Sequence, residues 1–191
     1  NDFNDKTYSI ELTGNTWSGS IKVPRLKQGT YSASEMNLSS SYEQTGSDYM
    51  ADTNTFTFTN SLKTTSLTVN KVWNDGNLVT THDAVNFVLQ YRAKGSTDEN
   101  GWQSYSSDTT YTLDATKKWT TTINNLPIYN DYRVVEVGTP GGYISNVSPD
   151  ENGVITITNT LKWCPVKIDK SASDTKYLER ATFELHENDQ L

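Results

Sequence analysis

The sequence predicts an all-β protein built of antiparallel β-sandwiches in tandem. Short runs that alternate apolar with polar residues recur between turn residues, and no amphipathic helix of about 10 residues is evident. Residues 85–91 could also be a helix, but the period of a strand fits them better. The composition agrees, because Thr, Ser and the 11 Tyr residues are typical of extracellular β-rich proteins, whereas helix-forming residues are sparse. A pattern near the start of the chain also returns later, which indicates more than one copy of the same fold.

Length and composition exclude several classes of protein. The 191 residues suffice for one or two domains with cores. A net charge of -7 disfavours nucleic acid and anionic membranes as partners, and no apolar run approaches the ~20 residues of a membrane span. Cys164 is the single cysteine, so no disulfide can form within the chain. Neither metal-ligand spacing nor a phosphate-binding glycine loop is present, and we expect no metal and no cofactor.

Two strands of nearly the same sequence mark the ends of successive repeats. Residues 56–63 read FTFTNSLK, and residues 155–162 read ITITNTLK. In each strand an asparagine, Asn60 or Asn159, takes a position of the alternation where another inward-facing apolar residue is expected. A buried amide without partners costs roughly 1–3 kcal/mol. Each asparagine therefore needs partners from elsewhere in its domain.

A glutamate precedes each of these asparagines at nearly the same spacing. Glu35 precedes Asn60, and Glu136 precedes Asn159. Glu136 shares the inward face of its predicted strand with apolar residues, by the two-residue period of a strand. The repeated spacing predicts that glutamate and asparagine meet in each repeat.

The repeat divides the chain into three parts. Residues 64–162 contain a complete set of strands, whereas residues 1–63 contain only the later strands of a domain and residues 163–191 only the first ones. The C-terminal part would complete the N-terminal part, either within one chain or between neighbouring chains that then associate head to tail. Trp17 and Trp119 occupy equivalent positions in successive repeats, so we expect both in a core.

Lys71, Glu136 and Asn159 each fall in register with core residues on three separate strands of the middle domain. Buried charges are costly unless they are paired. If the three side chains converge, burial favours a neutral amine and a protonated carboxyl. The amine can then attack the amide carbon while the carboxyl polarises the amide, and loss of ammonia gives a Lys–Asn isopeptide bond. A hydrogen-bonded cluster that never reacts is the alternative that the residues alone leave open.

Three stretches of the middle domain resemble the signature stretches of the collagen-adhesin B-type (Cna-B) family, which forms stalks of Gram-positive surface adhesins and pilins. The stretches are residues 71–75 (KVWND), 132–136 (YRVVE) and 158–160 (TNT). The resemblance implies tandem inverse immunoglobulin-like sandwiches with intramolecular isopeptide bonds. It assigns Lys71 as nucleophile, Asn159 as acceptor and Glu136 as catalyst of a single-turnover self-crosslinking reaction, not of an enzyme.

The flanking parts resemble the same family less completely. Residues 1–63 match the C-terminal part of such a domain, with Glu35 as catalyst and Asn60 as acceptor, and residues 163–191 match an N-terminal part. Lys167 is the candidate lysine by its spacing to the strand that follows. Alternation alone would nominate Lys170 instead, and we prefer the spacing.

The resemblance implies a mechanical function. The chain would be a stalk segment of an extracellular, cell-wall-anchored adhesin or pilin, secreted and then stiffened by isopeptide bonds. Its partners would be neighbouring domains of the same surface protein, and a host matrix ligand would bind elsewhere in that protein. The alternative function is a ligand-binding adhesin domain for a host matrix protein or glycan. No hydrolase triad or glycosidase-type carboxylate pair points to a multiple-turnover enzyme.

Overall fold

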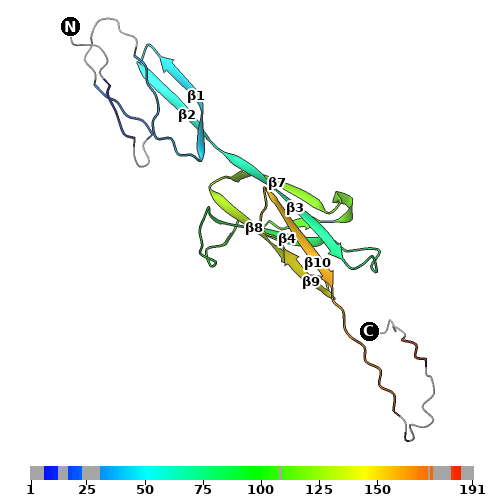
Figure 1. Cartoon of the computed structure of the whole chain (residues 1–191). Helices are drawn as coiled ribbons and strands as arrows, with labels where there is room; N and C mark the ends of the chain where they lie inside the picture. The colour runs from blue at the N-terminus through cyan, green and yellow to red at the C-terminus, as the bar shows by residue number, and fades with distance from the viewer. Residues whose placement is uncertain are drawn as a thin grey trace. The chain divides into compact units, whose positions relative to one another are not determined.

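The computed structural model of the chain describes residues 7–12, 17–22, 31–107, 109–171, 173 and 182–185. The chain divides into two compact units, Asn1–Lys63 and Thr64–Leu191, which are described separately (Figure 1). Within the described ranges the regular structure is strand, apart from one short 3-10 helix. Nothing helical in those ranges has the length and apolar character needed to cross a membrane.

The first unit contains an antiparallel hairpin of β1 (Tyr42–Met50) and β2 (Thr55–Leu62), which lie side by side in Figure 1. Its turn includes Asn54 in the left-handed region at φ 51°, a conformation that asparagine tolerates better than most residues. Every second residue of β2 is half-buried and the others are exposed. The predicted strand with Asn60 on its inner face is therefore present as β2.

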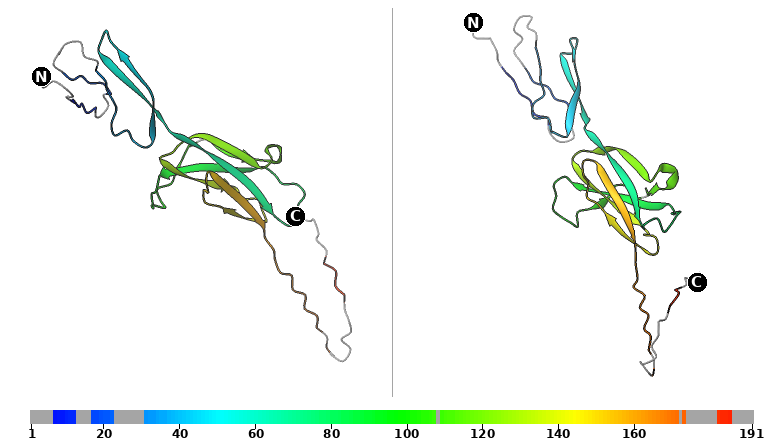
Figure 2. Two further views of the ribbon diagram at one scale, coloured as in Figure 1. Left: turned by 45° about the horizontal axis from the view of Figure 1, so that its top comes forward. Right: turned by 45° about the vertical axis from the view of Figure 1, so that its right-hand side comes forward.

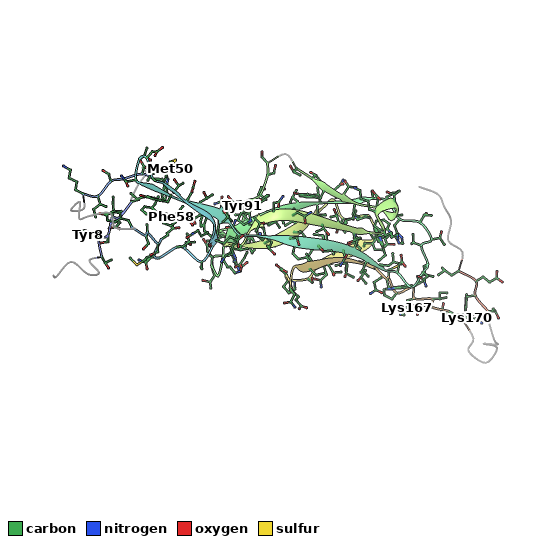
Figure 3. All side chains as sticks on the ribbon, turned by 90° about the horizontal axis from the view of Figure 1, so that it is seen from above. Tyr8, Met50, Phe58, Tyr91, Lys167 and Lys170 are labelled. Carbon is green, nitrogen blue, oxygen red and sulfur yellow. The ribbon has the colours of Figure 1, made fainter. Side chains whose placement is uncertain are left out.

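Trp17 is not a core residue, so that prediction is wrong. Its side chain is 81% exposed, and Tyr8, labelled in Figure 3, is 43% exposed. The described residues 7–12 and 17–22 form no strand. A tryptophan is buried by a sandwich only where a second layer covers it, and the sheet described in this unit is the β1–β2 hairpin. The equivalent Trp119 in the second unit does pack against the core.

The second unit is a sandwich of two sheets. The first sheet has the strand order β7-β3-β10-β9. Its strands are β7 (Thr120–Pro127), β3 (Thr64–Asn74), β10 (Val154–Leu161) and β9 (Tyr143–Val147). β3 pairs with β10 in parallel, and both views of Figure 2 show these two strands side by side. The predicted antiparallel sandwich does not extend to this pair, because alternation places residues on a face but does not fix strand direction.

The second sheet is centred on β4 (Val85–Ala93), which pairs with β8 (Asn130–Val137) along one edge. Along its other edge β4 pairs with two short strands, β5 (Gln103–Ser104) and β6 (Tyr111–Leu113). The 3-10 helix η1 (Ala115–Lys117) follows β6. All pairs in this sheet are antiparallel.

The inward residues of the two sheets form one core. They alternate with exposed or half-buried residues along each strand, as the two-residue period predicts. The fully buried apolar side chains are Leu67, Val69, Phe87, Leu89, Leu113, Leu126, Ile155 and Ile157. The predicted all-β sandwich of the middle part of the chain is thus confirmed.

Phe87→Ala should destabilise the second unit by about 3–5 kcal/mol, because the cavity that it leaves in the core adds to the lost burial of the ring. Val72→Ala is the matched control, since Val72 lies on the outer face of β3 and is 45% exposed. Urea unfolding followed by tryptophan fluorescence measures both free energies of unfolding. Equal losses for the two variants would contradict this placement of the core.

Candidate functional site

Lys71 lies on β3 with its side chain in the sandwich. The period of the strand aligns it with Leu67 and Val69, and only 5% of it is exposed. Its Nζ donates to the carbonyl oxygens of Val72, at 3.1 Å, and Ile157, at 3.5 Å. Burial lowers the pKa of the amine from 10.5 to about 8, although the negative charge of Glu136 acts in the opposite direction. A neutral, nucleophilic form of this amine is therefore far more populated than in an ordinary lysine.

Asn159 lies on the neighbouring strand β10 and is fully buried. The parallel register sets Ile157 opposite Lys71 and Asn159 opposite Trp73. Lys71 and Asn159 thus share the inner face of adjacent strands with an offset of one inward position. Paired strands are ~4.8 Å apart, and a lysine side chain is long and flexible enough to span that offset.

Glu136 reaches the amide from the facing sheet. It is half-buried on β8, and its Oε1 accepts a hydrogen bond of 2.9 Å from Asn159 Nδ2. Its Oε2 accepts a second hydrogen bond, of 3.1 Å, from the hydroxyl of Thr139. The structure therefore brings the three predicted side chains of the middle domain to one place, from β3, β8 and β10.

The orientation of the Asn159 amide differs from the one that an acid role for Glu136 requires. Nδ2 faces the carboxylate, and the buried Oδ1 has no hydrogen-bond partner. This arrangement suits an ionised Glu136, which can only accept. A half-turn about the Cβ–Cγ bond would instead present Oδ1 to a protonated carboxyl, and it would satisfy an oxygen whose isolation costs about 1–3 kcal/mol.

The first unit contains a similar glutamate–asparagine pair. Asn60 Nδ2, from β2, lies 2.9 Å from each of the two Glu35 carboxylate oxygens, and Asn60 Oδ1 is buried without a partner. Lys167 and Lys170 lie on the segment that follows β10 (Figure 3). The Lys167 side chain is 83% exposed and forms an ion pair of 2.9 Å with Asp169. The use of either lysine with Asn60 stays a prediction.

Two contacts at the site, one of Thr139 and one of Trp73, were missed by sequence reasoning. Thr139 lies in the turn after β8, where no period predicts its contact with Glu136. Trp73, two residues after Lys71, has its ring centroid 4.2 Å from the Lys71 Nζ. The two-residue period of the strand does predict Trp73 on the same face as Lys71, but it does not predict that the indole lies over the amine. Among the described residues, no three His, Cys, Asp or Glu side chains gather as a metal site.

Comparisons with known proteins give structural neighbours only. No protein-family model and no curated protein sequence match the chain. Two B repeat units of the collagen binding protein of Staphylococcus aureus match with a TM-score of 0.43 and 22% identity, over 61% of this chain and 30% of theirs. A single B repeat unit of that protein gives 0.42 and 23%, over 60% and 58%. The pilus backbone of Streptococcus pneumoniae gives 0.38 and 25%, over 53% and 21%.

The solved structures that this chain is similar to thus include Cna B repeat units and pilins of Gram-positive bacteria. The chain spans less than two thirds of each of the three solved chains compared above.

An Asn159→Leu variant, in which the amine has no amide beside it, should become more stable as pH rises from 8 to 10.5. In that window the folded protein has lost the Lys71 proton while the unfolded chain still binds it, so deprotonation favours folding. The gain is about 3 kcal/mol at most.

Urea unfolding at a series of pH values measures this dependence. A double variant with Lys71→Met as well is the matched control, because every other titrating group is kept. If both variants showed the same pH dependence between 8 and 10.5, the lowered pKa of Lys71 would be contradicted.

Proposed function

We propose that residues 64–162 are a stalk domain of a Gram-positive surface adhesin or pilin, stabilised by an autocatalytic isopeptide bond between Lys71 and Asn159. One observation carries the proposal: a buried lysine and a buried asparagine lie on adjacent strands, with Glu136 hydrogen-bonded to the amide. The resemblance of residues 71–75, 132–136 and 158–160 to the Cna-B signature supports it.

The chemistry needs no other reactant. The Lys71 Nζ attacks Asn159 Cγ, the Nζ–Cγ bond forms and the Cγ–Nδ2 bond breaks. Glu136 donates its proton toward the amide as the tetrahedral intermediate forms and later passes a proton from the amine to Nδ2, which leaves as ammonia. The folded sandwich excludes water and holds the groups in contact, which supplies a high effective concentration for a slow reaction that occurs once per molecule.

The position of the bond suits a load-bearing role. β3 and β10 are the first and last strands of the middle domain, so a pull on its two ends enters at Thr64 and leaves at Leu161. A covalent link from Lys71 to Asn159 carries that load directly. The chain between these two residues would then stay folded under tension. Neighbouring domains of the same extracellular, wall-anchored protein are the partners that transmit the force.

The N-terminal part, residues 1–63, is proposed to be an incomplete domain of the same kind. Its Glu35–Asn60 pair has the hydrogen bond of the middle domain, but neither of the two strands described in this part, β1 and β2, bears a lysine. Residues 163–191 would supply that strand, in the same chain or in a neighbouring one. Lys167 is then the nucleophile, with Lys170 as the alternative.

The intact mass of the purified protein should be lower than the sequence mass by one ammonia for each bond. Peptide mapping should detect a crosslinked pair of peptides that contains Lys71 and Asn159. If a second ammonia is lost, a second crosslinked pair should contain Lys167 and Asn60. Glu136→Ala should restore the mass of the first ammonia, because the amide is then left without a proton relay. A wild-type protein of full sequence mass would sink the proposal, and a bond that still forms in Glu136→Ala would remove the role of Glu136.

The rate of crosslinking should fall as pH rises through about 8. The reactive form of the Lys71–Glu136 pair has a neutral amine and a protonated carboxyl. It holds the same number of protons as the unreactive form with an ammonium and a carboxylate. The fraction of molecules in the reactive form therefore does not depend on pH until the pair loses its last proton. That proton leaves the Lys71 amine, whose pKa is about 8, and the rate should then drop about tenfold per pH unit.

Intact-mass time courses after a pulse of cell-free synthesis, diluted into buffers of different pH, measure this profile. Asn159→Leu is the control for background loss of ammonia. A rate that climbs through pH 8 would show that Glu136 acts as a carboxylate and would contradict its acid role.

A further inference from the structure

A buried carboxylate, that of Asp75, lies close to the Lys71 site and takes no part in the proposed crosslinking chemistry. We propose that Asp75, His82 and Tyr143 are positioning residues that hold the Trp73 indole as a cover over the Lys71 amine. This inference rests on the proposed crosslinking reaction and assigns to that reaction residues that neither the spacing nor the reacting atoms identify.

Asp75 follows directly after β3 and is 5% exposed. Its Oδ2 accepts hydrogen bonds from His82 Nε2, at 2.6 Å, and from the Tyr143 hydroxyl, at 3.2 Å. Its Oδ1 accepts from the backbone N–H of Asn77, at 3.0 Å. These contacts, that of His82 first, hold the pKa of Asp75 below its usual range. A buried carboxylate with its oxygens occupied in this way fixes the groups that donate to it.

The groups that Asp75 fixes are the ones that enclose the indole. The His82 ring stacks on Trp73, with centroids 4.1 Å apart and an interplanar angle of 19°. Tyr143 meets the same indole edge-on at 5.0 Å, and Trp119 does so at 5.6 Å. A stacked imidazole covers one face of the indole, so the Lys71 Nζ, 4.2 Å from the same centroid, must occupy the other face.

An indole in this position acts on the amine in two ways. It takes the place of water above Nζ, and this desolvation favours the neutral, nucleophilic form. It also confines Nζ between its face and the Ile157 carbonyl of β10, on the side of the sheet where Asn159 lies. The attraction of the ring for an ammonium opposes the first effect. Burial lowers the pKa of Lys71 to about 8, although the charge of Glu136 raises it.

The titratable groups around this amine come from three elements besides its own strand. Glu136 faces it from β8, and its charge raises the pKa of Lys71. Asp75, His82 and Tyr143 lie behind or beside the indole, from the end of β3, the loop before β4 and the start of β9. Loss of the Asp75 charge would by itself lower the pKa of the amine. An upward shift on removing that charge therefore reports loss of the cover.

The competing explanation is that the cluster formed by Asp75, His82 and Tyr143 only fills one end of the core. The two explanations differ in a measurable way. A filler that is weakened lowers stability and slows crosslinking alike at every pH. A cover that is loosened admits water to Nζ, raises the pKa of Lys71 and moves the falling limb of the rate profile to higher pH.

The test compares two variants of the full chain with matched controls. Asp75→Asn removes the carboxylate, and Tyr143→Phe removes one of its donors. Asp98→Asn is the control for the first, because the Asp98 Oδ1 likewise accepts from a backbone N–H, that of Asn100, in the loop between β4 and β5. Tyr91→Phe is the control for the second, because its hydroxyl donates to Gln103. Intact-mass time courses across pH give the rates, and circular dichroism shows which variants fold.

We expect Asp75→Asn and Tyr143→Phe to crosslink about tenfold more slowly at neutral pH. The pH at which the rate begins to fall should rise by about one unit. The reason is that raising the pKa of Lys71 by one unit lowers the fraction of neutral amine about tenfold. In the control variants, the crosslinking rate should fall at the same pH as in the wild-type protein. Should Asp75→Asn fail to fold, Tyr143→Phe alone decides the matter, because it removes a single hydroxyl.

The outcomes separate the two levels of the proposal. A wild-type chain that never loses ammonia refutes the crosslinking reaction itself. A wild-type chain that crosslinks beside folded cluster variants with an unmoved limb refutes only the positioning role. Slowing that is equal at every pH and is shared by Asp98→Asn and Tyr91→Phe also refutes it.

Discussion

The parallel pairing of β3 with β10 is the constraint on which the rest of the second unit depends. Two parallel neighbours cannot be joined by a hairpin, so a crossover must connect them. Here the crossover is the remainder of the domain, including the whole second sheet. Because of this pairing, the first and last strands of the domain share an inner face, and Lys71 and Asn159 become neighbours although the sequence separates them widely.

The polar groups in this core are tolerable because each has at least one hydrogen-bond partner. β8 brings a carboxylate to the Asn159 amide, and two backbone carbonyls accept from the Lys71 amine. Even so, Asn159 Oδ1 remains without a partner. A core optimised only for stability would have an apolar residue there, since replacing buried polar groups by apolar ones is often stabilising. Under the proposed crosslinking reaction, this residual cost would be the cost of keeping a reactive amide in the core.

Sequence reasoning predicted most of the middle domain because a strand exposes its faces with a period of two. That period placed Lys71 and Asn159 among core residues, and the repeat linked Glu136 to Asn159. It carries no information on strand direction, so the parallel pair was missed. Trp17 was misplaced because repeat equivalence says nothing about whether a covering layer is present. His82 could not be assigned, since it lies in a loop and meets Trp73 only after folding.

The offset between Lys71 and Asn159 makes formation of the proposed bond depend on the register of β10. Slippage of β10 by one residue would turn its whole inner face outward, and the amide would leave the core together with Ile155 and Ile157. Under the proposed chemistry, a misaligned molecule could not form the isopeptide bond, whereas a correctly aligned molecule would form it irreversibly. The isopeptide bond would then be present only in molecules whose strands had been correctly aligned. Only those molecules would carry tension through a covalent link.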